Sequence, residues 1–162
     1  MSLSEAAEAV TAERERVAEE QEADDAEQAV RADRARAEAL RTRWVSPLRT
    51  YSLLGPEDEG IGLAAESGTP VHAIGTGTIR YAGTDDEYGQ MIVIEHWDGT
   101  LTYYCYLSSF EKTEGEVAVG ELIGRVGNTG TTQASHLHLQ VRPRGEDPVD
   151  PLVWLAKRGV QL

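Results

Sequence analysis

Cysteine is nearly absent from this 162-residue chain: Cys105 is the only one, so no disulfide can form within the molecule. No apolar run of about 18 residues occurs, which argues against a membrane-spanning helix. Positive charge is also scarce, with 15 Lys and Arg against 28 Asp and Glu. The net charge of −13 argues against nucleic acid and anionic membranes as partners, because both would be repelled. The first residues show no signal peptide, so we expect a cytosolic protein or one whose export segment was removed.

Glycine and proline are both missing from residues 4–43, where Ala, Glu and Arg dominate. This composition favours one helix of about 60 Å, with Ser4 as its N-cap. Large apolar residues are sparse and form two stripes in different registers: Leu3, Val10 and Val17, then Ala26, Val30, Ala37, Leu40 and Trp44. We predict that residues 1–43 form a coiled-coil arm that makes a homo-oligomer through residues 4–43 or docks a partner. The alternative is a solvated helix held by Glu–Arg pairs.

Residues 44–162 have a different composition, because glycine becomes frequent and Thr, Val, Ile and Tyr replace Ala and Glu. Short runs of these residues between turn signals predict a β domain. The whole chain is therefore expected to be α+β, with a long N-terminal helix before a mostly antiparallel β domain. A last helical turn is expected at Val153–Lys157. The candidate strands are Thr50–Leu53, Pro70–Ala73, Gly77–Ala82, Gln90–His96, Thr100–Leu107, Leu122–Val126 and Leu137–Arg142.

Two of the four histidines, His136 and His138, are separated by a single leucine in a strand-like run. Alternation along a strand places both imidazoles on one face, with Leu137 and Leu139 on the other. That geometry suits a metal ligand beside a general base. The other titratable candidates have simpler interpretations. His72 and His96 are expected to be structural, and Cys105 is expected to point into the core.

Several segments of residues 44–156 together resemble the LytM, or lysostaphin-like, domain of M23 peptidoglycan endopeptidases. They are Gly68–Val71 with Gly77–Ile79, Gly89–His96, Thr102–Ser108, Ile123–Gly130 and His136–Leu139. The resemblance implies the LytM β fold for residues 44–162. Members of that family cleave peptide cross-links of the cell wall with one zinc ion and an activated water.

The resemblance also assigns the family's functional positions to this chain, and most of them are altered. Asp58 stands where the family has a ligand histidine, and Gly62 where it has a ligand aspartate. Tyr106 replaces one catalytic histidine, whereas His136 matches the other and His138 matches the third ligand. We therefore expect no zinc, no cofactor and no enzymatic activity. A weak metal site at Asp58 and His138, with help from Glu57 or Glu59, is the open alternative. The candidate groove residues are Asp58, Tyr104, Tyr106, His136 and His138.

Family members that lack zinc ligands and carry an N-terminal coiled coil regulate separate wall hydrolases, typically amidases during cell division. The resemblance thus implies a regulator or scaffold of peptidoglycan hydrolysis, outside the membrane of a bacterial cell envelope. Its expected partners are peptidoglycan, a wall hydrolase, or both. Three alternatives remain: a peptidoglycan-binding module without activity, a zinc metalloendopeptidase with rearranged ligands, and a structural coiled-coil protein with a β-domain cap.

Overall fold

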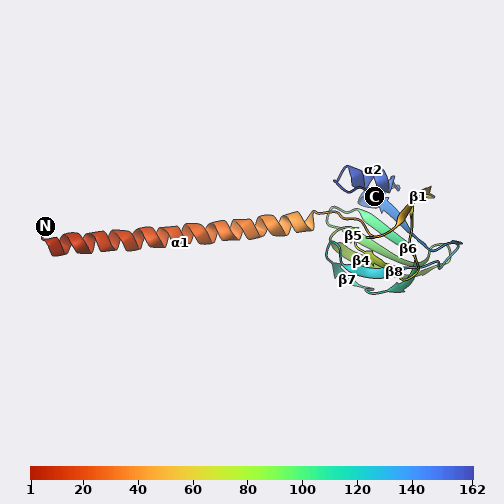
Figure 1. Cartoon of the computed structure of the whole chain (residues 1–162), viewed down its shortest axis with the longest axis horizontal. Coiled ribbons are helices and arrows are strands. Elements are labelled where there is room, and N and C mark those ends of the chain that lie inside the picture. Colours follow the sequence, from red (N-terminus) through yellow and green to blue (C-terminus); the bar gives the residue numbers. More distant parts are fainter. The chain divides into compact units, whose positions relative to one another are not determined.

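The computed structural model describes all 162 residues, which divide into two compact units, Met1–Ala39 and Leu40–Leu162. The first helix, α1, spans Leu3–Arg41 (Figure 1). None of its residues is buried. No helix is long and apolar enough to cross a membrane. Ion pairs such as Arg16 with Glu13 and Glu20 line the surface of α1, and each stabilises the helix by a few tenths of a kcal/mol. Whether α1 forms a coiled coil stays a prediction.

The N-cap of α1 lies two residues before the predicted one. Ser2, not Ser4, caps the helix: its hydroxyl accepts a hydrogen bond from the Glu5 amide at 3.2 Å. The Glu5 carboxylate accepts one in return from the Ser2 nitrogen at 2.6 Å. This reciprocal pair is a capping box, which satisfies donors that the first helical turn leaves unpaired.

Trp44 also departs from the prediction, which placed it on the second helical stripe. It lies after the end of α1, bridges Gly75 and is only 8% exposed. Its indole packs edge-on against Trp154 and His96, with ring centroids 4.6 and 4.9 Å apart. Burial of this large ring in the β core outweighs the continuation of the helical pattern.

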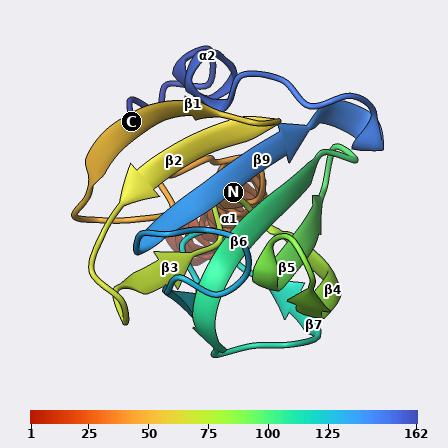
Figure 2. The ribbon, with the colours of Figure 1, turned by 90° about the vertical axis from the view of Figure 1, so that its right-hand side faces the viewer.

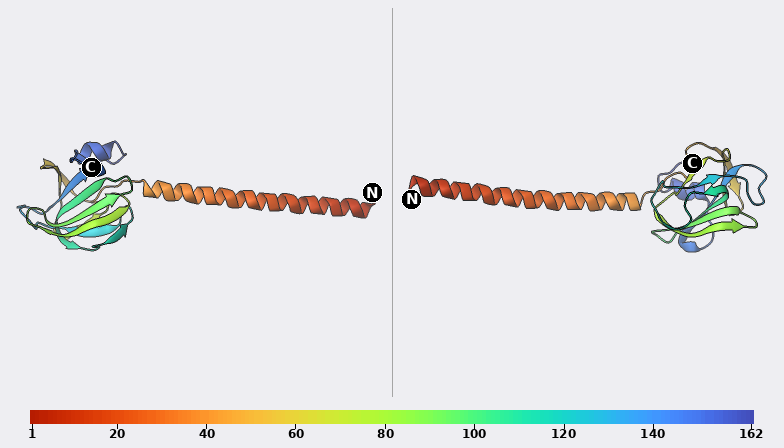
Figure 3. Two further views of the ribbon diagram at one scale, coloured as in Figure 1. Left: turned by 180° about the vertical axis from the view of Figure 1, so that it is seen from behind. Right: turned by 90° about the horizontal axis from the view of Figure 1, so that it is seen from below.

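The second unit is built on one nine-stranded antiparallel sheet, which confirms the predicted α+β fold (Figure 2). Its main path runs β1-β2-β9-β6-β5-β4-β7, and β8 pairs with β6 and β3. A short 3₁₀ turn follows the last strand. The helix α2 comes after it, close to the C-terminus (Figure 3). The elements are β1 Ser52–Glu57, β2 Gly60–Ala64, β3 Pro70–His72, β4 Gly77–Asp85, β5 Gly89–His96, β6 Leu101–Phe110, β7 Gly115–Val117, β8 Leu122–Val126, β9 His136–Arg142, the 3₁₀ turn Pro143–Gly145 and α2 Pro151–Ala156.

Two strands, β2 and β7, were not predicted, and β2 is the more consequential. Its sequence, Gly-Ile-Gly-Leu-Ala, has two glycines, which weaken a strand signal. In the structure it is a central strand that pairs with β1 on one side and β9 on the other. It therefore brings Gly62 directly beside the histidines of β9.

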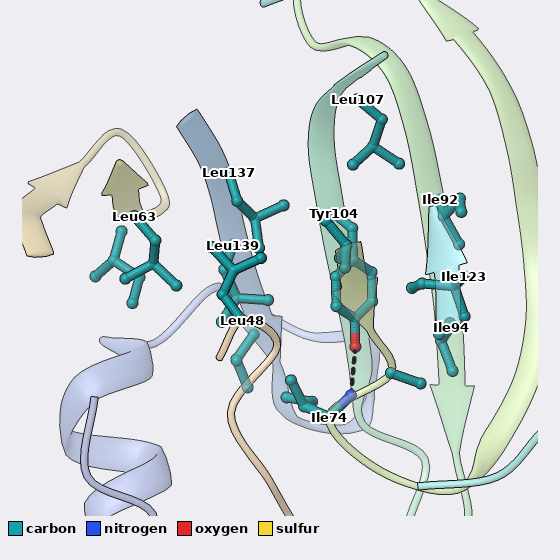
Figure 4. Close-up of a cluster of buried hydrophobic side chains, with 14 of the residues drawn as sticks. Leu48, Leu63, Ile74, Ile92, Ile94, Tyr104, Leu107, Ile123, Leu137 and Leu139 are labelled. Atoms are coloured by element: carbon teal, nitrogen blue, oxygen red, sulfur yellow. Dashed lines mark hydrogen bonds between the residues drawn. The ribbon is translucent and has the colours of Figure 1, made fainter. Parts of the chain in front are cut away.

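The main core lies on one face of the sheet, where β9 contributes Leu137 and Leu139 (Figure 4). Tyr104, a predicted groove residue, also belongs to this core and is fully buried. Its hydroxyl accepts a hydrogen bond from the Ile74 amide at 3.0 Å and lies 3.0 Å from Thr102 Oγ1. Burial raises the pKa of Tyr104 to about 12. The groove assignment of Tyr104 is thus wrong, because strand alternation turns this side chain to the core face.

Candidate functional site

The predicted histidines lie where three neighbouring strands meet. On β9, His138 pairs with Gly62 of β2 on one side and with Cys105 of β6 on the other. His136 pairs with Ala64 of β2. Both imidazoles are nearly buried, with side chains 2–6% exposed. The sheet therefore brings together three of the predicted positions, Gly62, His136 and His138, although they come from separate parts of the sequence.

The carboxylate that meets these histidines belongs to Glu57, the last residue of β1. One of its oxygens lies 2.7 Å from His138 Nδ1, and the other lies 3.0 Å from His136 Nε2. Asp58 is exposed in the following turn and lines the same pocket, as predicted for a groove residue, but the carboxylate that reaches the imidazoles is that of Glu57. The reason is the hairpin itself: Glu57 is the last paired residue before the turn, so its side chain still projects from the sheet.

Glu59, the third acid of this run, points elsewhere. It has a left-handed backbone conformation, with φ of 63°, and its carboxylate accepts a hydrogen bond from Arg142 at 2.8 Å. The three consecutive acids thus have three different roles: Glu57 contacts the histidines, Asp58 faces solvent at the pocket edge, and Glu59 pairs with an arginine. Local sequence carries little signal for this division, because the turn conformation decides it.

Gly62 has a direct spatial relation to Glu57. A Cβ atom at residue 62 would lie 2.3 Å from Glu57 Oε1 and 2.8 Å from its Cδ. The carboxylate therefore fills the space where a side chain at residue 62 would begin. An aspartate at residue 62 would therefore require the Glu57 carboxylate to move away from its present position.

A chain of polar side chains behind His138 determines which of its nitrogens carries the proton. Arg142 donates hydrogen bonds to Gln140 Oε1 at 3.2 and 3.3 Å, so the amide oxygen of Gln140 faces the arginine. The amide nitrogen then faces His138 Nε2 at 3.1 Å and donates to it. His138 Nδ1 is left to carry the hydrogen that it donates to Glu57. Burial lowers the pKa of His138, and the Glu57 carboxylate opposes that shift.

His136 has acceptors opposite both ring nitrogens. Its Nδ1 lies 2.8 Å from the Ala134 carbonyl oxygen, and its Nε2 faces the Glu57 carboxylate. Thr132 Oγ1 lies 3.2 Å from the same Nδ1. The ring is thus held in position from two sides, by the loop before β9 and by β1.

Tyr106, which the LytM resemblance aligns with a catalytic histidine, faces both imidazoles. Its ring centroid lies 5.0 Å from that of His136 and 5.8 Å from that of His138. It sits at an irregularity in the β5–β6 ladder with φ of 65°, a conformation that costs a non-glycine residue about 1–2 kcal/mol. Burial, with the Glu57 charge, raises the pKa of the Tyr106 phenol, so this side chain is not a base at neutral pH.

Four further residues line the pocket, and sequence reasoning missed them as site residues. One of them, Glu87, adds a second acid beside Asp58. Tyr88 stacks on His138 with ring centroids 5.5 Å apart, and burial raises its pKa to about 12. Thr131 and Thr132 come from the loop before β9. Together these side chains surround a pocket of about 250 Å³. Its lining residues are Glu57, Asp58, Glu87, Tyr88, Tyr106, Thr131, Thr132, His136 and His138.

These residues do not fit the zinc ion that the LytM resemblance implies. A zinc site needs several lone pairs directed at one point, but His138 directs an N–H into the site and Gly62 supplies nothing. Glu57 accepts from the imidazoles where a metal would have to bind them. No group of three or more His, Cys, Asp or Glu is arranged to hold a metal ion.

The two remaining histidines and Cys105 make contacts that support the fold and lie outside the pocket. His96 is 3% exposed, and its ring lies 3.0 Å from the Thr76 carbonyl and 2.7 Å from Thr102 Oγ1. His72 is half-buried and contacts the Gly120 carbonyl at 3.1 Å. Cys105 is fully buried, and burial raises the pKa of its thiol far above the usual range, which leaves it unreactive.

Three known proteins are similar to this chain in sequence or in structure. The chain is 44% identical over 93 residues to the DD-carboxypeptidase/endopeptidase Mpg of Neisseria meningitidis, covering 57% of this chain and 21% of Mpg. It is 31% identical over 121 residues to the murein hydrolase activator NlpD of Escherichia coli, covering 72% of this chain and 31% of NlpD. The antimicrobial peptidase lysostaphin of Staphylococcus simulans has a similar structure, with a TM-score of 0.62 and 31% identity over 67% of this chain and 50% of lysostaphin.

The chain spans less than a third of the length of either curated relative. Those two relatives also differ from each other in their names, one being a peptidase and the other an activator. The likeness thus defines the domain more firmly than the activity. Residues 56–151 match peptidase family M23. The LytM resemblance is confirmed, and the chain belongs to peptidase family M23.

Proposed function

We propose that this chain is a non-catalytic LytM-type protein that regulates or scaffolds peptidoglycan hydrolysis at the cell envelope, by activating a partner wall hydrolase. The observation that carries the proposal is the Glu57 carboxylate, which lies between His136 and His138 beside a glycine at the ligand position. The likeness to a protein named as a murein hydrolase activator supports it.

Two side chains of the pocket, His138 and Tyr106, are not suited to activate a water for peptide hydrolysis. A general base needs a free lone pair within reach of that water. His138 presents an N–H, and Tyr106 presents a protonated phenol. Glu57 Oε2 already lies within hydrogen-bond distance of both imidazoles, 2.7 Å from His138 Nδ1 and 3.2 Å from His136 Nε2. A tetrahedral intermediate would also lack a metal to stabilise its charge.

The rest of the chain suits a protein that acts through contacts. A net charge of −13 would complement a basic patch on a partner and would increase the rate of encounter. Residues 4–43 would provide oligomerisation or a docking surface. This role places the protein outside the cytoplasmic membrane, with peptidoglycan and a wall hydrolase as its partners.

Release of soluble fragments from purified peptidoglycan tests the proposal. The protein is incubated with wall alone, with added zinc, and with a wall amidase from the same bacterium. We expect no release by the protein alone, with or without zinc, and faster release by the amidase in its presence. Release of fragments by this protein alone contradicts the proposal.

A second candidate is a peptidoglycan-binding module without activity. The open pocket favours it, because the faces of Tyr88 and Tyr106 and the hydroxyls of Thr131 and Thr132 could hold a peptide stem. Sedimentation with purified wall separates the two candidates. Binding that is lost in Tyr106→Ala and His136→Ala, without any effect on an amidase, favours the binding module.

The third candidate, a zinc metalloendopeptidase with rearranged ligands, is favoured by the name of the relative Mpg. It requires that Glu57 leave the histidines and that another residue complete a ligand set. Stoichiometric zinc in the purified protein, together with wall cleavage, would establish it.

A further inference from the structure

We propose that the pocket of this domain is a carboxylate-binding site and that its occupant is the chain's own Glu57. The carboxylate fills the space that a side chain at residue 62 would need. It also lies between the two imidazoles, where a metal would otherwise bind. The inference rests on one claim of the proposed function, that the domain binds no catalytic metal. It does not depend on which wall partner the domain engages. It concerns three residues, Glu57, His136 and His138, and the glycine that makes room for the first.

The space argument depends on Gly62. A Cβ there would lie 2.3 Å from Glu57 Oε1, well inside van der Waals contact. The next nearest side-chain atom, Leu54 Cβ, would be 3.3 Å away, a distance that small adjustments can relieve. Glu57 is thus the main obstacle to a side chain at residue 62. Glycine at this position and the inserted carboxylate are two parts of one arrangement.

The hydrogen-bond argument depends on the donors. Arg142 orients Gln140, and Gln140 donates to His138 Nε2, so that His138 directs its Nδ1–H into the pocket at 2.7 Å from Glu57. His136 approaches the other oxygen at 3.0 Å. An inward N–H group such as that of His138 binds an anionic acceptor, whereas a metal requires a lone pair from the same nitrogen.

The surroundings explain why the occupant is internal. Asp58 and Glu87 line the same pocket, so a free anion would approach against their negative charge. Glu57 avoids most of that cost because the β1–β2 hairpin already holds it beside the histidines, which gives it a high effective concentration. The carboxylate pairs with imidazoles that are 2–6% exposed. Solvent screens this contact far less than it screens the surface ion pairs of α1.

Chemical rescue of Glu57→Ala tests the proposal. Loss of the carboxylate leaves the buried Nδ1–H of His138 without its acceptor, so we expect the melting temperature to fall by at least about 5 °C. Sodium acetate should restore part of this loss in a saturable way, while sodium chloride at equal ionic strength should not. Wild type and the matched control Asp58→Ala should show no acetate effect beyond that of chloride. The same response to acetate in all three proteins, or none in Glu57→Ala, overturns the proposal.

Mutual exclusion provides an independent test. In wild type, Gly62→Ala should displace the Glu57 carboxylate and lower the melting temperature nearly as much as Glu57→Ala does. In the Glu57→Ala background both close contacts of the new Cβ, with Glu57 Oε1 and Cδ, are gone and Leu54 Cβ at 3.3 Å comes next, so the double variant should melt close to Glu57→Ala. Additive losses in the double variant contradict a shared space.

The wild-type protein supplies a readout that does not depend on the stability of any variant. Long-range ¹H–¹⁵N spectra of the histidine side chains at neutral pH should show His138 with its proton on Nδ1 and a lone pair on Nε2. A proton on Nε2 overturns the proposal. Wall-hydrolysis assays measure the proposed function separately, so failure of one claim can be told from failure of the other.

Discussion

The amide nitrogen of Gln140 lies 3.1 Å from Nε2 of His138, and this contact determines the tautomer that faces Glu57. Gln140 is 1% exposed, so water cannot replace the hydrogen bond. Its own orientation depends on Arg142, which donates to the amide oxygen. Gln140, which does not line the pocket, therefore determines which nitrogen of His138 presents an N–H to it.

Exchange of Gln140 for glutamate should reverse this control. In Gln140→Glu, a carboxylate faces His138 Nε2 and favours a proton there, while Glu57 still favours one on Nδ1. Two acceptors stabilise the imidazolium, so the pKa of His138, which burial lowers in wild type, should rise. An NMR titration of the His138 ring checks this. An unchanged or lower pKa would show that Gln140 does not control the ring.

His96 should make stability depend on pH. Burial lowers its pKa from 6.5 to about 4, so between these values the unfolded chain binds more protons than the folded one. This contribution to the free energy of unfolding is fully present above pH 6.5 and is lost as the pH falls towards 4. The loss from pH 8 to pH 5 should be about 2 kcal/mol.

Urea unfolding at several pH values measures this dependence. Because residue 96 does not titrate in His96→Gln, that variant should lose less free energy over the same interval, whatever its stability at pH 8. Equal losses in both proteins would contradict the assignment.

Gly75→Ala should destabilise the junction between Trp44 and the β core. A Cβ at residue 75 would lie 2.7 Å from the Trp44 ring and 3.1 Å from His96 Nδ1. Neither ring can rotate away, since Trp44 also packs on Trp154. We expect a loss of about 1–3 kcal/mol in the free energy of unfolding, as for overpacked cores. Chemical denaturation followed by tryptophan fluorescence measures this loss. An unchanged denaturation midpoint in Gly75→Ala would show that Trp44 does not pack tightly against residue 75.

The coiled-coil prediction for residues 4–43 leads to a test by sedimentation. Val10, Val17, Val30 and Leu40 are each about half exposed in α1, and a long polar helix without packing is marginal in water. We expect the full chain to form a homo-oligomer and residues 44–162 to be monomeric. Val10→Lys with Val17→Lys should weaken the association. A monomeric full chain at every concentration would favour the solvated helix.

The sequence predicts those parts of the fold and site that depend on periodicity. Strand alternation places His136 and His138 on one face and Leu137 and Leu139 in the core, as the structure shows. The change from Ala-rich to Gly-rich sequence predicts a helix before a β domain. The resemblance to LytM domains places Gly62 and Tyr106 at the site, and the structure puts Gly62 opposite His138 and Tyr106 within 6 Å of both rings.

The role of Glu57 could not be predicted from sequence, because three acids stand in a row at residues 57–59. Which of them reaches the histidines depends on where the β1–β2 hairpin turns, and Glu59 adopts a left-handed conformation there. The strand β2, which forms this hairpin with β1, was also not predicted, because its two glycines weaken the strand signal. Tyr88 was missed for a similar reason, since its neighbourhood gives only a turn signal while its ring stacks on a distant strand.

The zinc content of the purified wild-type protein tests the central claim most directly. The protein is incubated with excess zinc chloride, dialysed and analysed by mass spectrometry of the metal. If Glu57 holds the place of the metal, the content should be far below one zinc ion per chain, as for a protein without a structured site. One zinc ion per chain, retained through dialysis, would contradict the account.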